Sequence, residues 1–182
     1  FAKVVGEVMD GLSSVVAFFG IAFGVTAMLL WGYTRSLKLS ALALLVALLP
    51  VIWLLGILPL IGYGIDPMSI LVPFLIFSIG VSHAVQMTNA WKQDVLAGES
   101  AEHASKIAFR NLAIPGTVAL LTNALGFMVI MLIDIPIVHE LGVTACLGVL
   151  LMIMTNKMIL PIILSHLKLE RHAQADAAAG TA

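Results

Sequence analysis

The residues of this chain that could take part in chemistry lie within hydrophobic stretches of the sequence. Polar residues recur at helical spacing along one stretch, so they share one face of a predicted helix: Ser78, Ser82, Gln86 and Asn89. His83 lies at the margin of that face. Imidazole changes charge near neutral pH, and a polar stripe on a membrane helix needs partners or water. The stretch therefore predicts a site that either moves a proton or another solute, or holds helices together.

Two other segments place polar residues at a similar predicted depth. Counting from the expected cytoplasmic ends of their helices, at 1.5 Å per residue, puts His83 about 12 Å deep, Lys157 about 13 Å and Asn123 about 16 Å. Ionisable side chains within a membrane usually face the protein interior or a wet cavity. The candidates for an ion-coupling polar layer are therefore Ser82, His83, Gln86, Asn123 and Lys157.

Each candidate also has a purely structural interpretation. Lys157 could extend its stem to the inner surface, His83 could be a neutral histidine with a hydrogen-bonded ring, and the amides and hydroxyls could join helices. No Asp or Glu is expected at the membrane centre, since Asp66, Asp134 and Glu140 are all expected at the outer ends of helices. A carboxylate partner for His83 would therefore come from outside this sequence.

The composition indicates which kind of fold positions these residues. The 182 residues are 61% hydrophobic and 10% charged, with a mean hydropathy of +1.11, whereas soluble domains carry about 25% charge. The predicted fold is all-α, a polytopic membrane bundle over residues 12–166. Its five transmembrane helices are predicted at about 12–33, 39–61, 68–91, 112–133 and 138–165.

Three further segments complete the predicted organisation. Residues 1–11 fit the end of a preceding extracytoplasmic region or an interfacial helix, and Phe1 in place of Met indicates a piece of a longer protein. Residues 92–111 are predicted as a cytoplasmic amphipathic segment, whose helix begins after Ser100 and lies at the membrane surface. Residues 167–182 are predicted as a cytoplasmic tail.

Basic residues set the predicted orientation. Two turns lack Lys and Arg, at 62–67 and 134–137, whereas the connections on the other side and the C-terminal tail hold seven: Arg35, Lys38, Lys92, Lys106, Arg110, Lys168 and Arg171. The positive-inside rule then predicts an extracytoplasmic N-terminus and a cytoplasmic C-terminus.

Several function classes find no support in the sequence. It contains no HExxH, CxxC, GxSxG or Walker motif, so we expect no enzyme, cofactor or metal site. It has no basic cluster that would bind nucleic acid. Its single cysteine, Cys146, is expected to be a small packing residue.

The order of several short motifs resembles the resistance–nodulation–division (RND) superfamily of transporters, in its branch of lipid and hydrophobe exporters (MMPL-like), and the related sterol-sensing domain. The resemblance covers roughly residues 10–168. The elements that carry it are Gly80-Val81-Ser82-His83, the helix from Ala101 to Arg110, Pro115, Thr122 with Gly126-Phe127, Pro136, Glu140-Leu141-Gly142, Gly148 and Leu160-Pro161.

This resemblance implies a fold and a function. Relatives have two six-span halves, and this chain is similar to spans two to six of one half. They export amphiphiles using proton flow through acidic residues on the central span. Here Ser82-His83 stands at the position of the usual Asp-Tyr pair, so either His83 takes that role, or the relay lies in the other half, or the coupling differs.

The predicted function is therefore the transmembrane part of a proton-motive-force-driven exporter of hydrophobic or lipid-like substrates. The alternative is a sterol- or lipid-sensing membrane domain without transport. The expected partners are membrane lipids, a hydrophobic substrate, the second half of the same transporter and possible homo-oligomers. The expected location is the bacterial inner membrane.

Overall fold

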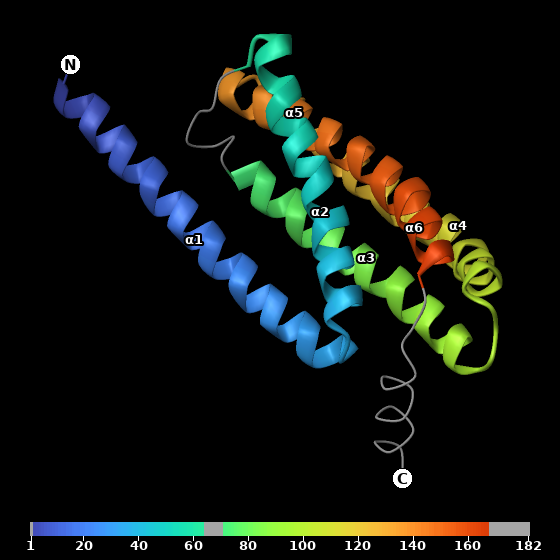
Figure 1. The fold of residues 1–182 in the computed structure, drawn as a ribbon. Helices are drawn as coiled ribbons and strands as arrows, with labels where there is room; N and C mark the ends of the chain where they lie inside the picture. Colours follow the sequence, from blue (N-terminus) through green and yellow to red (C-terminus); the bar gives the residue numbers. More distant parts are fainter. Residues whose placement is uncertain (1, 64–70, 168–182) are drawn as a thin grey trace.

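A computed structural model describes the backbone of residues 2–63 and 71–167, and the side chains of that part from Ser13 onward. Its helices follow the chain as shown in Figure 1. They are α1 (Ala2–Thr34), α2 (Leu37–Ile57), the 3₁₀ turn η1 (Leu58–Ile61), α3 (Leu71–Leu96), α4 (Ala101–Ile130), α5 (Pro136–Met154), the π-helical turn η2 (Thr155–Ile159) and α6 (Leu160–His166).

Five helical segments are long and apolar enough to cross a membrane, which confirms the predicted all-α bundle. They are Ser13–Thr34, Leu37–Ile61, Leu71–Leu96, Ala101–Ile130 and Pro136–His166. The start predicted for the third span, at residue 68, lies outside the described residues, as do most of the predicted turn at 62–67 and of the tail. The last span is continuous through α5, η2 and α6.

The prediction of a separate amphipathic helix before the fourth span is wrong. Residues 101–111 are instead the first turns of α4, which continues without a break through Pro115 to Ile130. Ser100 caps this helix as expected, since its Oγ accepts a hydrogen bond from the amide of His103 at 3.2 Å. The sequence suggested a break because polarity changes near residue 111, but a change of surroundings does not by itself end a helix, and α4 also continues past Pro115, which removes one backbone donor.

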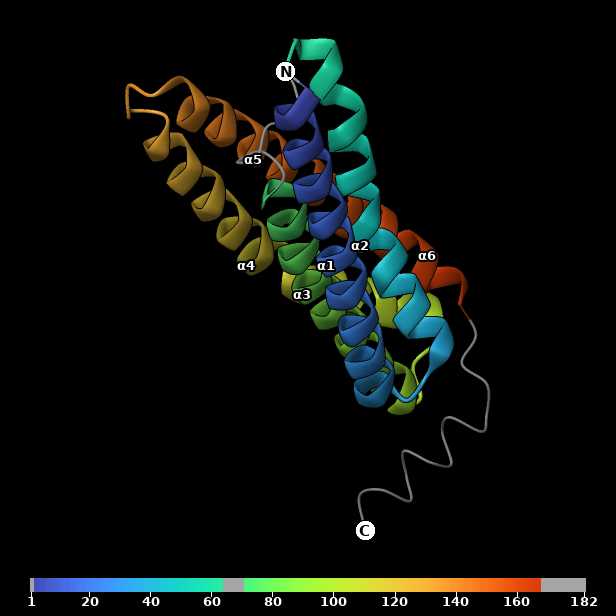
Figure 2. The same ribbon diagram turned by 90° about the vertical axis from the view of Figure 1, so that its left-hand side faces the viewer.

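Helices α2, α3 and α5 form the centre of the bundle, and α1 and α4 lie at its edges. Figure 1 shows α1 at one edge of the arrangement, and Figure 2 shows α4 at an edge. Helix α1 packs through aromatic rings, with Phe19 against Phe74 at 4.8 Å and Phe23 against Phe77 at 5.6 Å between centroids. Both edge helices expose apolar side chains, which suits contact with lipid or with another part of a larger assembly.

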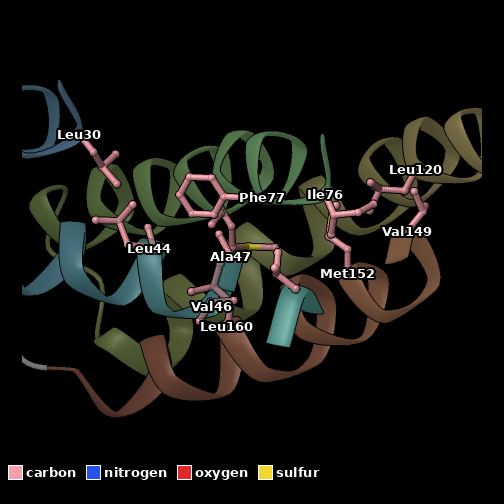
Figure 3. Packing of buried hydrophobic residues seen from close by; sticks show 14 of the residues in the cluster. Leu30, Leu44, Val46, Ala47, Ile76, Phe77, Leu120, Val149, Met152 and Leu160 are labelled. Carbon is pink, nitrogen blue, oxygen red and sulfur yellow. The ribbon is translucent and has the colours of Figure 1, made fainter. Parts of the chain in front are cut away.

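Small residues bring the central helices close together. A Cβ at Gly80 of α3 would lie 3.4 Å from the backbone of Ala47 of α2. A Cβ at Gly148 of α5 would lie 2.6 Å from Ile76 and 3.2 Å from Leu54, both fully buried. Figure 3 shows this core, where Ile76 of α3 meets Val149 and Met152 of α5. In a membrane bundle such close packing, rather than water exclusion, holds helices together.

One end of the bundle is tied by hydrogen bonds between its turns. Lys92 Nζ donates to the carbonyl of Thr34 at 2.7 Å, at the C-terminus of α1. Trp91 is fully buried and its Nε1 donates to the carbonyl of Ala101 at 2.9 Å. The connections 35–36 and 97–100 therefore lie at the same end, as predicted. Tyr63 and Asp134 share a pocket that lies at the opposite end.

Gly148→Leu is expected to lower the stability of the full-length protein, because the added side chain has no room beside Ile76 and Leu54. Overpacking of this kind costs about 1–3 kcal/mol. Thermal unfolding in detergent measures the effect. The matched control is Gly126→Leu, since no atom lies within 4 Å of a Cβ built there. Equal unfolding temperatures for the two variants would contradict the close packing of α5 on α2 and α3.

Candidate functional site

His83 and Lys157 meet against the backbone of α4, on a surface that the small residue Gly116 leaves open. A Cβ at Gly116 would lie 2.2 Å from Lys157 Nζ and 3.7 Å from His83 Nδ1. Both nitrogens are measured from the same point, so they lie no more than about 6 Å apart. Three segments of the chain, α3, α4 and η2, thus bring two of the five predicted residues together. Gly116 was not among the predicted site residues, because a glycine carries no side chain that would mark it.

The ammonium of Lys157 is held by a backbone carbonyl. Its Nζ donates to the Leu112 carbonyl at 2.9 Å. Pro115, three residues further along α4, has no N–H, so this turn of the helix lacks one donor. The carbonyl that Pro115 leaves without its helical donor is that of Asn111, four residues earlier, so Lys157 binds the carbonyl next to it.

A local irregularity lies where Lys157 is attached to its helix. Residues Thr155–Ile159 form a π turn, in which the Leu160 amide bonds to the Thr155 carbonyl, five residues back. Pro161 follows at once and supplies no N–H, and its ring crowds the preceding turn. Such single π turns within α-helices are frequent at functional sites. The π turn therefore marks the segment that carries Lys157.

Electrostatics links the two basic groups. Among the described residues no carboxylate pairs with either of them; the ion pairs found join Lys106 to Glu102 and His103 to Glu99. Like charges at this separation oppose each other, so a proton on one group disfavours charge on the other. Protonation of His83 would therefore place a second positive charge beside the ammonium of Lys157.

The hydrogen bond of Lys157 also revises its predicted depth. Leu112 is the residue at which the fourth span was expected to begin, yet Lys157 was counted as about 13 Å deep. Since their polar atoms are bonded, both lie at one level. Charged residues on α4 end at Arg110, which is exposed, and exposed aliphatic residues begin at Ile114. This places the ammonium near the boundary between polar and apolar surface.

The other three predicted residues do not join this pair in the described fold. Ser82, Gln86 and Asn123 are exposed, whereas His83 and Lys157 are half-buried. The stripe that starts at Ser78 therefore faces away from the rest of the bundle. Sequence spacing predicts that Ser78, Ser82 and Gln86 share one face of α3, but it could not tell whether that face points inward.

Further buried polar groups were not predicted as site residues. Asn156, beside Lys157 in the π turn, is 1% exposed, and neither its amide oxygen nor its amide nitrogen has a hydrogen-bond partner among the described residues. The hydroxyls of Thr88 and Thr144 are also buried without a partner there. Buried polar groups normally have a hydrogen-bond partner, and an ordered water molecule can serve as that partner.

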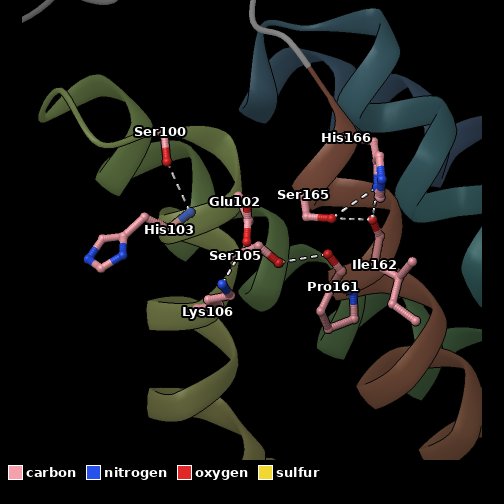
Figure 4. A network of polar contacts seen from close by, with 9 residues as sticks. All are labelled: Ser100, Glu102, His103, Ser105, Lys106, Pro161, Ile162, Ser165 and His166. Atoms are coloured by element: carbon pink, nitrogen blue, oxygen red, sulfur yellow. Dashed lines mark hydrogen bonds and ion pairs between the residues drawn. The ribbon is translucent and has the colours of Figure 1, made fainter.

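A groove opens on the other side of Lys157, between the first half of α4 and the segment η2–α6. Its volume is about 740 Å³. Figure 4 shows its polar end, where Lys106 pairs with Glu102 at 2.6 Å and Ser105 Oγ donates to the Pro161 carbonyl at 2.6 Å. His166 lines the same end and bonds through Nδ1 with Ser165. Neither the groove nor the link from Ser105 was predicted from the sequence.

A comparison with known families bears on this arrangement. The family described as the sterol-sensing domain of SREBP cleavage-activation matches residues 34–179. The chain belongs to the sterol-sensing domain family. It is thus a multi-pass membrane segment of that family, with five long apolar helices in the described part. No curated protein and no solved structure matches the chain.

We expect Gly116→Ala to be destabilising only while Lys157 is present, because the new methyl group would occupy the place of its ammonium. In a Lys157→Met background the same change should be neutral, since the shorter, uncharged side chain can bend away. The expected coupling is about 1 kcal/mol. Thermal unfolding of the four combinations in the full-length protein measures it. Gly126→Ala serves as control and should be neutral in both backgrounds; additive effects of Gly116→Ala and Lys157→Met would show that the two residues do not meet.

Proposed function

We propose that this chain is the transmembrane part of an RND-type exporter of hydrophobic or lipid-like molecules, driven by the proton motive force. The observation that supports the proposal most directly is the convergence of His83 and Lys157 on Gly116. Two titratable groups from different helices meet there without a carboxylate partner among the described residues. The sequence motifs of the RND superfamily point to the same span.

The proposed coupling follows from the repulsion between the two groups when both are protonated. A proton on His83 repels the ammonium of Lys157 and weakens its hold on the Leu112 carbonyl. Loss of that proton restores the bond. Because Lys157 belongs to the π turn, its movement shifts η2 relative to α4. Proton movement can thus be coupled to a change in how these helices pack, which transport requires.

The exposed polar face of α3 supports a contact with another protein segment in the same membrane. Ser78, Ser82 and Gln86 are exposed in the described fold, and polar side chains facing lipid are costly. We propose that this face meets the second half of the same transporter or a second copy, and that the full protein lies in the bacterial inner membrane. Loop charge supports a cytoplasmic position for the end that carries Lys92 and Lys106.

The alternative function, sterol or lipid sensing without transport, is favoured by the groove between α4 and α6 and by the family match. In that case His83 and Lys157 would hold helices in one arrangement, and no proton flow would pass them. The two functions differ in a measurable quantity, namely proton movement across the membrane.

Substitution of His83 tests the exporter. The full-length protein is reconstituted in liposomes with an imposed pH gradient, and proton flux is followed with a pH-sensitive dye while N-phenylnaphthylamine serves as the hydrophobic probe. We expect His83→Asn to reduce gradient-driven probe movement at least about tenfold, since positioned proton-transfer groups typically contribute that much or more.

The matched control is His103→Asn, because His103 is exposed and its ring lies 3.8 Å from Glu99 at the start of the same segment, away from Lys157. It should leave both signals unchanged. Full gradient-driven flux in the His83→Asn protein would remove His83 from the mechanism. Absence of any flux in the unmodified protein, together with a lipid-dependent conformational change, would favour sensing.

A further inference from the structure

The groove between α4 and η2–α6 has an unbalanced charge. Its polar residues include two lysines, Lys106 and Lys157, and one carboxylate, Glu102. Lys106 binds Glu102 at 2.6 Å, so that carboxylate is already matched. Lys157 lines the groove with no acidic partner among the described residues. His166 lines the polar end of the same groove.

Lys157 retains donors for another group. An ammonium has three N–H donors, and the described residues accept only one hydrogen bond from it, at the Leu112 carbonyl. A charge partly removed from water is costly unless it is paired. The groove thus presents an ammonium that an anion could stabilise.

The walls of the groove are apolar. Phe109 of α4, Met158 of η2 and Ile162 of α6 line it and are 41%, 60% and 60% exposed. The size of the groove lies within the range of small-molecule sites. A site with one unpaired cation and exposed apolar walls suits a molecule that has an anionic head and hydrocarbon chains.

The level of Lys157 indicates the source of that molecule. Its ammonium lies beside Leu112, between the last charged residue of this part of α4, Arg110, and the first strongly exposed aliphatic residue, Ile114. Lipid phosphates lie at such a boundary between polar and apolar surface. A lipid of the surrounding leaflet can therefore offer its phosphate to Lys157 and its chains to Met158 and Ile162 without leaving the membrane.

We propose that this groove binds an anionic phospholipid of the cytoplasmic leaflet, whose phosphate accepts hydrogen bonds from Lys157. The proposal does not depend on export, because a lipid site serves a transporter or a sensor equally. It does link the lipid to the coupling pair, since the bound phosphate would contact the lysine that lies beside His83.

Lipid retention by the full-length protein tests the site. The protein is purified in detergent, incubated with dioleoyl-phosphatidylglycerol or dioleoyl-phosphatidylcholine, and examined by native mass spectrometry. We expect preferential retention of phosphatidylglycerol, and a loss of about tenfold in Lys157→Gln, which corresponds to one charge-assisted hydrogen-bonded contact. Lys157→Arg should retain the preference.

A second variant tests the apolar wall without touching the charge. Ile162→Trp should reduce retention of phosphatidylglycerol by filling the groove, and its exposed position makes misfolding of the bundle a small risk. The matched charge control is Lys38→Gln, which lies on α2 outside the groove and should have no effect. His103→Asn, at an exposed residue of α4 that does not line the groove, should also leave lipid retention intact.

Three outcomes would overturn the proposal. Equal retention of the two lipids would show that no anion is recognised. An equal loss in Lys38→Gln and Lys157→Gln would show a diffuse effect of surface charge. Retention of oleate but not of phosphatidylglycerol would show that a carboxylate, and not a lipid phosphate, is the ligand.

Discussion

Hydrogen bonds from side chains to helix carbonyls determine how this bundle closes at one end. Such a bond joins a side chain of one helix to the main chain of another, so it fixes how far along each other the two helices lie. Prolines lie near both contacts, Pro115 in α4 and Pro161 in the last span, although the bonded carbonyls are not the ones that these prolines deprive of a helical donor. Lys157 donates to the carbonyl of Leu112, and Ser105 donates to that of Pro161. These two contacts run in opposite directions between the same helices and fix their register.

The remaining arrangement depends on that register. With α4 and η2–α6 aligned, Gly116 lies opposite Lys157, and His83 of α3 reaches the same point. The groove follows from the same alignment, because its two walls are the helices that these contacts join. Close packing by Gly80 and Gly148 holds α2, α3 and α5 behind them. The irregular parts of the helices thus lie at the site, and the regular parts form its support.

The number and approximate bounds of the spans were predictable because hydrophobic length reports them directly. The prediction failed for residues 101–111, because amphipathic character indicated a surface helix while helical continuity through Pro115 left no sequence signal. His83 and Lys157 were found because charge is rare in a span. Their meeting point was not predictable, because it depends on a glycine and a main-chain carbonyl, which look ordinary in a sequence. The outward direction of Ser82, Gln86 and Asn123 likewise depends on packing among helices rather than on periodicity within one.

The π turn at Thr155–Ile159 has a consequence for how the last span tolerates changes in length. A π turn holds one residue more than an α turn, and each residue of an α-helix advances it by about 100°. Because the wider turn takes up the extra residue within a single turn, the helix that follows keeps its rotational phase. Deleting one residue there would restore a regular helix and leave Leu160 and Leu164, now fully buried, facing the core. The same deletion in a regular part of the last span would rotate everything after it by about 100°, so loss of one residue should be tolerated better at Thr155–Ile159 than elsewhere in this span.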